Sequence, residues 1–142
     1  MSRILILCTG NSCRSQMAEG YLKSFDNNLE VYSAGTKPAA KANPFAIQAM
    51  KEVGIDISKG IPEDVGKYIN QSFDYVITVC DNAKEVCPVF SGDVKHQLHM
   101  PFDDPADAVG TEEEVIPVYR RVRDEIKVRF QKFHNEEIDS LN

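Results

Sequence analysis

The sequence predicts an α/β fold, a doubly wound open sheet of about four parallel strands with helices on both faces. Short apolar runs alternate along the chain with segments whose apolar residues recur at helical spacing, which is typical of parallel strands joined by helical crossovers. Segment 73–79 is apolar over most of its length, as expected for a central strand covered on both faces. The chain has 142 residues, enough for one core, so we expect residues 1–142 to form a single domain.

Four segments have the composition of strands. The first is short and apolar and leads directly into a loop, and the second follows the turn residues 26–28. The expected strands cover residues 3–7, 29–33, 73–79 and 94–100. Ligands of open parallel sheets bind beyond the carboxyl ends of the strands, so the residues that follow these strands are candidates for a site.

Helices are expected between the strands. The first covers residues 16–25 and presents one apolar face, formed by Met17, Tyr21, Leu22 and Phe25. The second covers residues 44–53, with Asn43 as its N-cap and Pro44 in its first position. A shorter helix is expected at residues 62–69.

A long helix is expected at the end of the chain. Pro117 predicts that its main body begins there, just after the acidic residues 112–114. Its buried face is expected to contain Val118, Val122, Ile126 and Phe130 or Phe133, which recur at helical spacing.

Composition and charge exclude several functional classes. The formal net charge is −6 and no basic stripe is present, so nucleic acid is not an expected partner. There is no apolar run long enough to span a membrane and no signal-peptide pattern at the N-terminus, so we expect a cytoplasmic protein with no membrane contact. The three histidines and four cysteines lack zinc-ligand spacing, and no such metal site is expected. In a reducing compartment, this pattern favours reduced, catalytic thiols.

The loop between the first strand and the first helix carries the chemistry. Cys8 ends the strand, and Arg14 stands six residues later at the start of the helix. Backbone N–H groups in such a loop converge on one point, where the helix dipole and the guanidinium add positive potential. The same charges favour a thiolate, so we expect Cys8 to be a nucleophile beneath a tetrahedral oxyanion. The expected oxyanion-binding residues are Thr9, Gly10, Asn11, Ser12, Cys13 and Arg14.

The loop resembles a known family. The pattern Cys8-x5-Arg14-Ser15 is similar to the phosphate-binding loop of the low-molecular-weight protein tyrosine phosphatases. The longer stretch 8–20 resembles the thioredoxin-coupled arsenate reductases of the same superfamily. Further matches follow in the family's order at 31–35, 49–53, 55–58, 102–106 and 121–126, whereas segment 37–42 departs from the pattern. The resemblance spans nearly the whole chain.

The resemblance to the arsenate reductases implies a thiol relay. Cys8 would attack arsenate, Cys80 would attack Cys8 and release arsenite, and Cys87 would then attack Cys80. Thioredoxin would reduce the resulting disulfide. If residues 80–87 are helical, the Cα atoms of Cys80 and Cys87 lie about 10 Å apart. A disulfide needs roughly 4.4–6.8 Å, so we expect this helix to unwind during the relay.

Three further assignments concern the same site. Asp104 precedes Pro105, as does the aspartate that acts as general acid in the family, whereas the adjacent Asp103 is not expected to be the acid. Ser15 either hydrogen-bonds the Cys8 thiolate or is a simple helix N-cap.

No cofactor is expected other than a stabilising potassium ion. Some members of the family bind this ion. Its candidate ligands here are Asn11, Glu19 and Ser33, and the match breaks down in segment 62–64, where a fourth ligand would lie.

Three classes of function remain open at this point. The first is a thioredoxin-dependent arsenate reductase with residual phosphatase activity. The second is a phosphatase that acts on phosphotyrosine or a small phosphoester through Cys8, Arg14 and Asp104, and the third is a non-catalytic oxyanion-binding module. Cys80 and Cys87 favour the first, because a phosphatase needs neither thiol. A monomer is expected.

Overall fold

The computed structural model describes residues 2–81 and 90–138, and it contains a four-stranded parallel sheet. The strands are β1 (Arg3–Cys8), β2 (Glu30–Gly35), β3 (Phe73–Thr78) and β4 (Val94–His99), in the order β2-β1-β3-β4. All three neighbouring pairs are parallel. The predicted fold class is therefore confirmed, and each predicted strand is present within two residues of its expected bounds.

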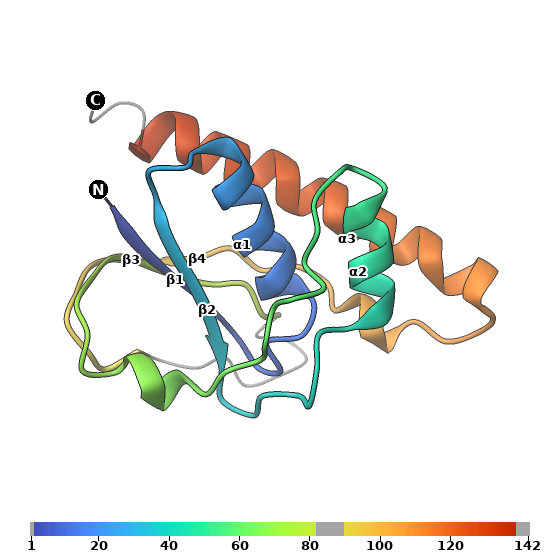
Figure 1. Cartoon of the computed structure of the whole chain (residues 1–142), viewed down its shortest axis with the longest axis horizontal. Coiled ribbons are helices and arrows are strands. Elements are labelled where there is room, and N and C mark those ends of the chain that lie inside the picture. The colour runs from blue at the N-terminus through green and yellow to red at the C-terminus, as the bar shows by residue number, and fades with distance from the viewer. Residues whose placement is uncertain (1, 82–89, 139–142) are drawn as a thin grey trace.

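Three α-helices cover one face of the sheet (Figure 1). They are α1 (Arg14–Phe25), α2 (Pro44–Lys51) and α3 (Glu112–Phe133). Ile4 and Ile6 of β1 point into this core, while the alternating Leu5 and Leu7 point into a smaller cluster on the opposite face. Among the described residues, that second cluster contains Tyr68 of the 3₁₀ helix η1 (Val65–Tyr68).

The helix boundaries correct three predictions. First, α1 begins at Arg14 rather than at residue 16, so the arginine belongs to the first turn. Second, only η1 forms within the helix expected at 62–69. Third, α3 begins at Glu112 rather than at Pro117, because Thr111 and Glu114 form a capping box that starts the helix earlier. The acidic residues thus lie inside its first turn.

The buried face of α3 also differs from the prediction. Val118 is only half-buried, whereas Tyr119 is among the fully buried residues of the helix. The earlier start explains the error in part, because residues Val115 and Ile116 join the core and extend the buried stripe toward the N-terminus. The predicted Val122, Ile126, Phe130 and Phe133 are buried.

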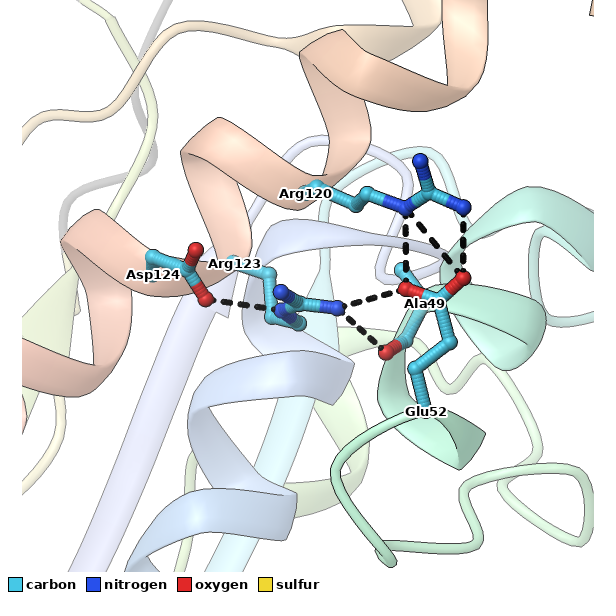
Figure 2. A network of polar contacts seen from close by, with 5 residues as sticks. All are labelled: Ala49, Glu52, Arg120, Arg123 and Asp124. Carbon is cyan, nitrogen blue, oxygen red and sulfur yellow. Dashed lines mark hydrogen bonds and ion pairs between the residues drawn. The ribbon is translucent and has the colours of Figure 1, made fainter. Parts of the chain in front are cut away.

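A polar network joins α2 to α3 at the end of α2 remote from Asn43 (Figure 2). Arg123 is 8% exposed and donates to the Ala49 carbonyl at 2.9 Å and to Glu52 Oε1 at 2.8 Å. Arg120 donates to the same carboxylate, with Nη2 to Oε2 at 2.7 Å, and Arg123 Nε bonds Asp124 at 2.8 Å. These contacts fix α2 against α3.

No helix among the described residues is long and apolar enough to cross a membrane.

Candidate functional site

The loop of residues 8–14 lies at the carboxyl end of β1, as predicted. Cys8 is the last residue of β1 and Arg14 is the first residue of α1, and both are buried. Asn11 has a φ of 52°, a left-handed conformation that asparagine tolerates better than most residues. This turn brings the chain from the strand end to the helix start within a few residues.

Five consecutive carbonyl groups of the loop accept hydrogen bonds from groups outside it. The pairs are Lys37 N to Thr9 O at 3.0 Å, Ala39 N to Gly10 O at 2.9 Å, Gln16 Nε2 to Asn11 O at 3.0 Å, Asn43 N to Ser12 O at 2.8 Å and Met17 N to Cys13 O at 2.9 Å. In a trans peptide the N–H points away from the carbonyl. The N–H groups of residues 10–14 therefore face the concave side of the loop, as an anion-binding loop requires.

The side chain of Asn11 also anchors the loop. Its Oδ1 accepts from the Glu63 backbone N–H at 2.9 Å, and its Nδ2 donates to Ser15 Oγ at 2.8 Å. Gly35, at the end of β2, lies directly behind the loop, because a Cβ at this position would stand 2.3 Å from the Thr9 carbonyl oxygen. Only glycine allows β2 to approach so closely.

Arg14 and Asp104 face each other at the loop. The Arg14 guanidinium donates from Nη1 to the Phe102 carbonyl at 3.2 Å, and Nη2 lies 3.4 Å from Asp104 Oδ2. The other carboxylate oxygen of Asp104 accepts from the Ala106 N–H at 3.0 Å, so Asp104 caps a short 3₁₀ turn, η2 (Pro105–Asp107). Each of the two charged groups therefore has a further hydrogen bond to the backbone that helps to fix its position at the loop.

These elements enclose a pocket of about 270 Å³. It is lined by residues 8–14 together with Asp104, Ala106 and Asp107. Cys8 is 3% exposed and still lines the pocket, so it lies at the floor. Asp103 is exposed and pairs with Arg121 at 3.1 Å. The structure thus brings Cys8, the loop, Arg14 and Asp104 together and places Asp103 on another partner.

Cys13 and Ser15 have different surroundings from those of Cys8. Cys13 is the N-cap residue of α1, a buried free thiol that lines the pocket. Burial raises the pKa of the Cys13 thiol, and the charge of Asp104 adds to this effect, so Cys13 stays protonated at neutral pH. Because Cys13 is the N-cap residue of α1, the prediction that Ser15 is the N-cap is wrong. Ser15 is the second residue of α1 and is fully buried.

Cys80 lies at the same end of the sheet as Cys8. β1 and β3 are parallel neighbours, and the Val79 N–H donates to the Leu7 carbonyl at 3.0 Å, so the two strand ends run side by side. Cys80 is fully buried and is disulfide-bonded in this structure. Cys87 and most of the helix expected at 80–87 lie outside the described residues.

The candidate potassium ligands fit a cation poorly. Ser33 Oγ donates to Glu19 Oε1 at 2.5 Å, and the Lys23 ammonium lies 2.5 Å from Glu19 Oε2. Both polar ends of the Asn11 side chain bond to other protein groups. A lysine thus already pairs with the carboxylate that a potassium ion would need. Among the described residues, there is also no cluster of three or more histidine, cysteine, aspartate or glutamate side chains that could hold a metal.

Several residues around the loop were not predicted. Lys37, Ala39 and Asn43 act through backbone N–H groups, which carry no signature in the sequence. Tyr119 lies close to the same region, because its hydroxyl bonds Asn43. The spacing from Tyr119 to Val122 and Ile126 is the signal that could have revealed it as a buried residue.

Comparisons with known proteins agree with this geometry. The chain matches the model of the family described as low molecular weight phosphotyrosine protein phosphatase over residues 3–141. It is 50% identical over 131 residues to an arsenate reductase of Halalkalibacterium halodurans and to one of Bacillus subtilis, and each alignment covers 92% of this chain and 93% of the relative. A solved arsenate reductase in the phosphate binding state is similar, with a TM-score of 0.77 and 30% identity over 94% of this chain and 96% of that one.

Proposed function

Because the chain belongs to the low molecular weight phosphotyrosine protein phosphatase family, we propose that it is an enzyme of the arsenate reductase branch and reduces arsenate to arsenite. The observation that carries this proposal is the pocket in which Cys8, the inward N–H groups, Arg14 and Asp104 meet. Relatives at 50% identity over most of both chains, named arsenate reductase, support the choice of this branch.

The first step is the formation of a covalent adduct. Arsenate binds in the loop, with Arg14 making a planar two-point contact to its oxygens. The Cys8 thiolate attacks arsenic, so that an S–As bond forms and an As–O bond breaks. Asp104, in its protonated form, gives its proton to the departing hydroxyl, which leaves as water. The loop N–H groups stabilise the negative charge throughout.

The second step supplies the two electrons. With Cys80 reduced, its thiolate attacks Cys8 Sγ; an S–S bond forms, the S–As bond breaks, and its electron pair stays on arsenic, which leaves as arsenite. The carboxyl ends of β1 and β3 support this transfer, because Cys8 ends β1, Cys80 follows β3, and the two strands are parallel neighbours. Cys87 then attacks Cys80 and frees Cys8. This last assignment rests on the family resemblance.

We propose thioredoxin as the reductant. Its dithiol reduces the Cys80–Cys87 disulfide by thiol–disulfide exchange. The reduction potential of thioredoxin, about −270 mV, is low enough to reduce a labile protein disulfide. A thiol relay of this kind needs a reducing compartment, so the proposed location is the cytoplasm. We also propose that residues 1–142 form a single domain, because the three α-helices pack on one sheet around a continuous core, and that this domain acts as a monomer.

Residual phosphoester hydrolysis is a second expected activity. A phosphate group has the same tetrahedral shape as arsenate, and Cys8, Arg14 and Asp104 form the nucleophile, clamp and acid that such hydrolysis needs.

A paired turnover assay tests the proposed function. Arsenate-dependent NADPH consumption is measured with thioredoxin and thioredoxin reductase, beside the hydrolysis of a small phosphoester. We expect arsenate turnover by the wild type and loss of both activities in Cys8→Ser, because an alcohol is a far weaker nucleophile at neutral pH. Arsenate turnover that persists in Cys8→Ser contradicts the assignment, and phosphoester hydrolysis without arsenate turnover leaves the phosphatase as the function.

A further inference from the structure

Asn43 joins the oxyanion loop to two helices. Its backbone N–H donates to the Ser12 carbonyl at 2.8 Å. Its side-chain Oδ1 accepts from the Phe45 N–H at 2.8 Å and from the Ala46 N–H at 3.3 Å, which caps α2 as predicted. Its Nδ2 donates to the hydroxyl of Tyr119, on α3, at 3.0 Å. One residue therefore contacts the loop, α2 and α3 at the same time.

Tyr119 is placed to hold the Asn43 side chain in one orientation. It is 3% exposed, and its ring packs against Phe45 with the centroids 5.4 Å apart. Burial raises the pKa of the Tyr119 phenol; the hydrogen bond from Asn43 acts in the opposite direction, but the net shift is upward, so the hydroxyl stays neutral. Because the phenol oxygen accepts from Nδ2, the amide oxygen of Asn43 is turned toward α2.

The contact between Asn43 and Ser12 bears directly on the oxyanion. The Ser12 carbonyl and the Cys13 N–H belong to the same peptide unit, so the bond that holds the carbonyl outward also aims the N–H inward. An N–H group held in this direction costs no reorganisation when the anion arrives. A shift of Asn43 would tilt this peptide unit and weaken its contact with the anion.

We propose that Tyr119 is a positioning residue for the oxyanion loop: its hydroxyl, acting through the Asn43 side chain, sets the direction of the Cys13 N–H toward the bound oxyanion. The inference rests on the proposed function in one respect: it takes arsenate to be the oxyanion that is bound during turnover. The positioning itself applies to any tetrahedral oxyanion in the loop. Tyr119 lies in α3, far from Ser12 in the sequence. Its contribution to the loop therefore depends on the packing of that helix.

The test is the variant Tyr119→Phe, which removes the hydroxyl and keeps the ring. We expect inorganic phosphate to bind about 2- to 10-fold more weakly by titration calorimetry, the range of one net hydrogen bond. The KM for arsenate should rise by a similar factor while kcat changes little, since the N–H contacts the anion in the ground state and in the transition state. Unchanged phosphate affinity overturns the proposal.

Two further variants separate positioning from a general loss of stability. Tyr21→Phe is the matched control, because the Tyr21 hydroxyl is also buried but has no hydrogen-bond partner among the described residues. It should bind phosphate as the wild type does, and an equal loss in both variants overturns the proposal. Asn43→Ser retains a helix-capping oxygen and the backbone N–H but cannot reach Tyr119. The double variant Asn43→Ser with Tyr119→Phe should lose no more affinity than either single variant, whereas additive losses overturn the route through Asn43.

The phosphate titration contains no arsenate and no reductant, so it is independent of the reductase assay. If the wild type fails to reduce arsenate and Tyr119→Phe still weakens phosphate binding, the proposed function fails and the role of Tyr119 stands. If Tyr119→Phe does not fold, Asn43→Ser alone provides the same comparison with the wild type, and unchanged affinity in that variant overturns the proposal.

Discussion

Arg14 Nη2 and Asp104 Oδ2 lie 3.4 Å apart at the oxyanion pocket. Arg14 is buried and is also oriented by the Phe102 carbonyl, whereas the Asp104 side chain is 27% exposed at the pocket. The pair therefore joins the floor of the site to the loop that carries the acid. An arriving oxyanion meets a guanidinium that is already oriented and a carboxyl group beside it. This arrangement allows the roles of clamp and acid to be tested separately.

Arg14→Lys should reduce kcat/KM for arsenate by about 10- to 10²-fold. A lysine ammonium cannot make two parallel hydrogen bonds, and charge-assisted bonds contribute about 1.5–3 kcal/mol each. Steady-state kinetics with the thioredoxin system measure the loss, and circular dichroism checks that the fold is intact. The charge is unchanged, so near-normal turnover in Arg14→Lys would show that charge alone holds the anion.

Asp104→Asn should slow the formation of the Cys8 adduct by about 10²–10⁴-fold, because the amide has no proton to give to the leaving oxygen. Phosphate affinity should be retained, since the loop N–H groups and Arg14 remain. Rapid-quench measurement of the first turnover checks the rate. Asp103→Asn is the control, because Asp103 is exposed and paired with Arg121. A large effect of Asp103→Asn with a small effect of Asp104→Asn would reverse the assignment.

Cys80→Ser should abolish arsenate turnover and spare phosphoester hydrolysis, because the hydrolysis needs no second thiol. Cys87→Ser should allow about one turnover and trap a disulfide between Cys8 and Cys80. Peptide mapping after arsenate treatment without reductant should find Cys80 joined to Cys87 in the wild type. Free thiols at both positions after arsenite has been released would exclude the relay.

Glu52 should make the stability of the fold depend on pH in the acidic range. Its hydrogen bonds to Arg120, followed by those to Arg123, hold the pKa of the Glu52 carboxyl below its ordinary value of 4.5 (Figure 2). A lowered pKa in the folded state means that the stabilisation is present above the unfolded value and is lost as the pH falls through the folded value. The melting temperature of the wild type should exceed that of Glu52→Gln at pH 7, and the difference should shrink below about pH 4.5. A difference that is constant with pH would contradict this role.

Much of the fold could be predicted because its signals are local. The apolar strand before Cys8, the cap at Asn43 and the helical spacing of Met17, Tyr21 and Leu22 each depend on neighbouring residues, and the structure contains all of them. The helix boundaries were less accurate. Pro117 was expected to start α3, but the capping box at Thr111 and Glu114 starts the helix earlier, since a local hydrogen-bond pair outweighs the preference of proline for the first turn.

The sequence by itself determined the parallel α/β class and the candidates Cys8 and Arg14, because strand, loop, charge and helix start follow one another within a few residues. Asp104 became a candidate through the family resemblance, which places an aspartate before a proline at this site. Only the tertiary structure decided how the loop is held. The N–H groups of Lys37, Ala39 and Asn43 bond its carbonyls, and Tyr119 bonds Asn43 from α3. Every residue except proline has a backbone N–H group, so the residue type does not reveal which acceptor this group bonds. The acceptor depends on how the helices and strands pack and which carbonyl they bring near the N–H group.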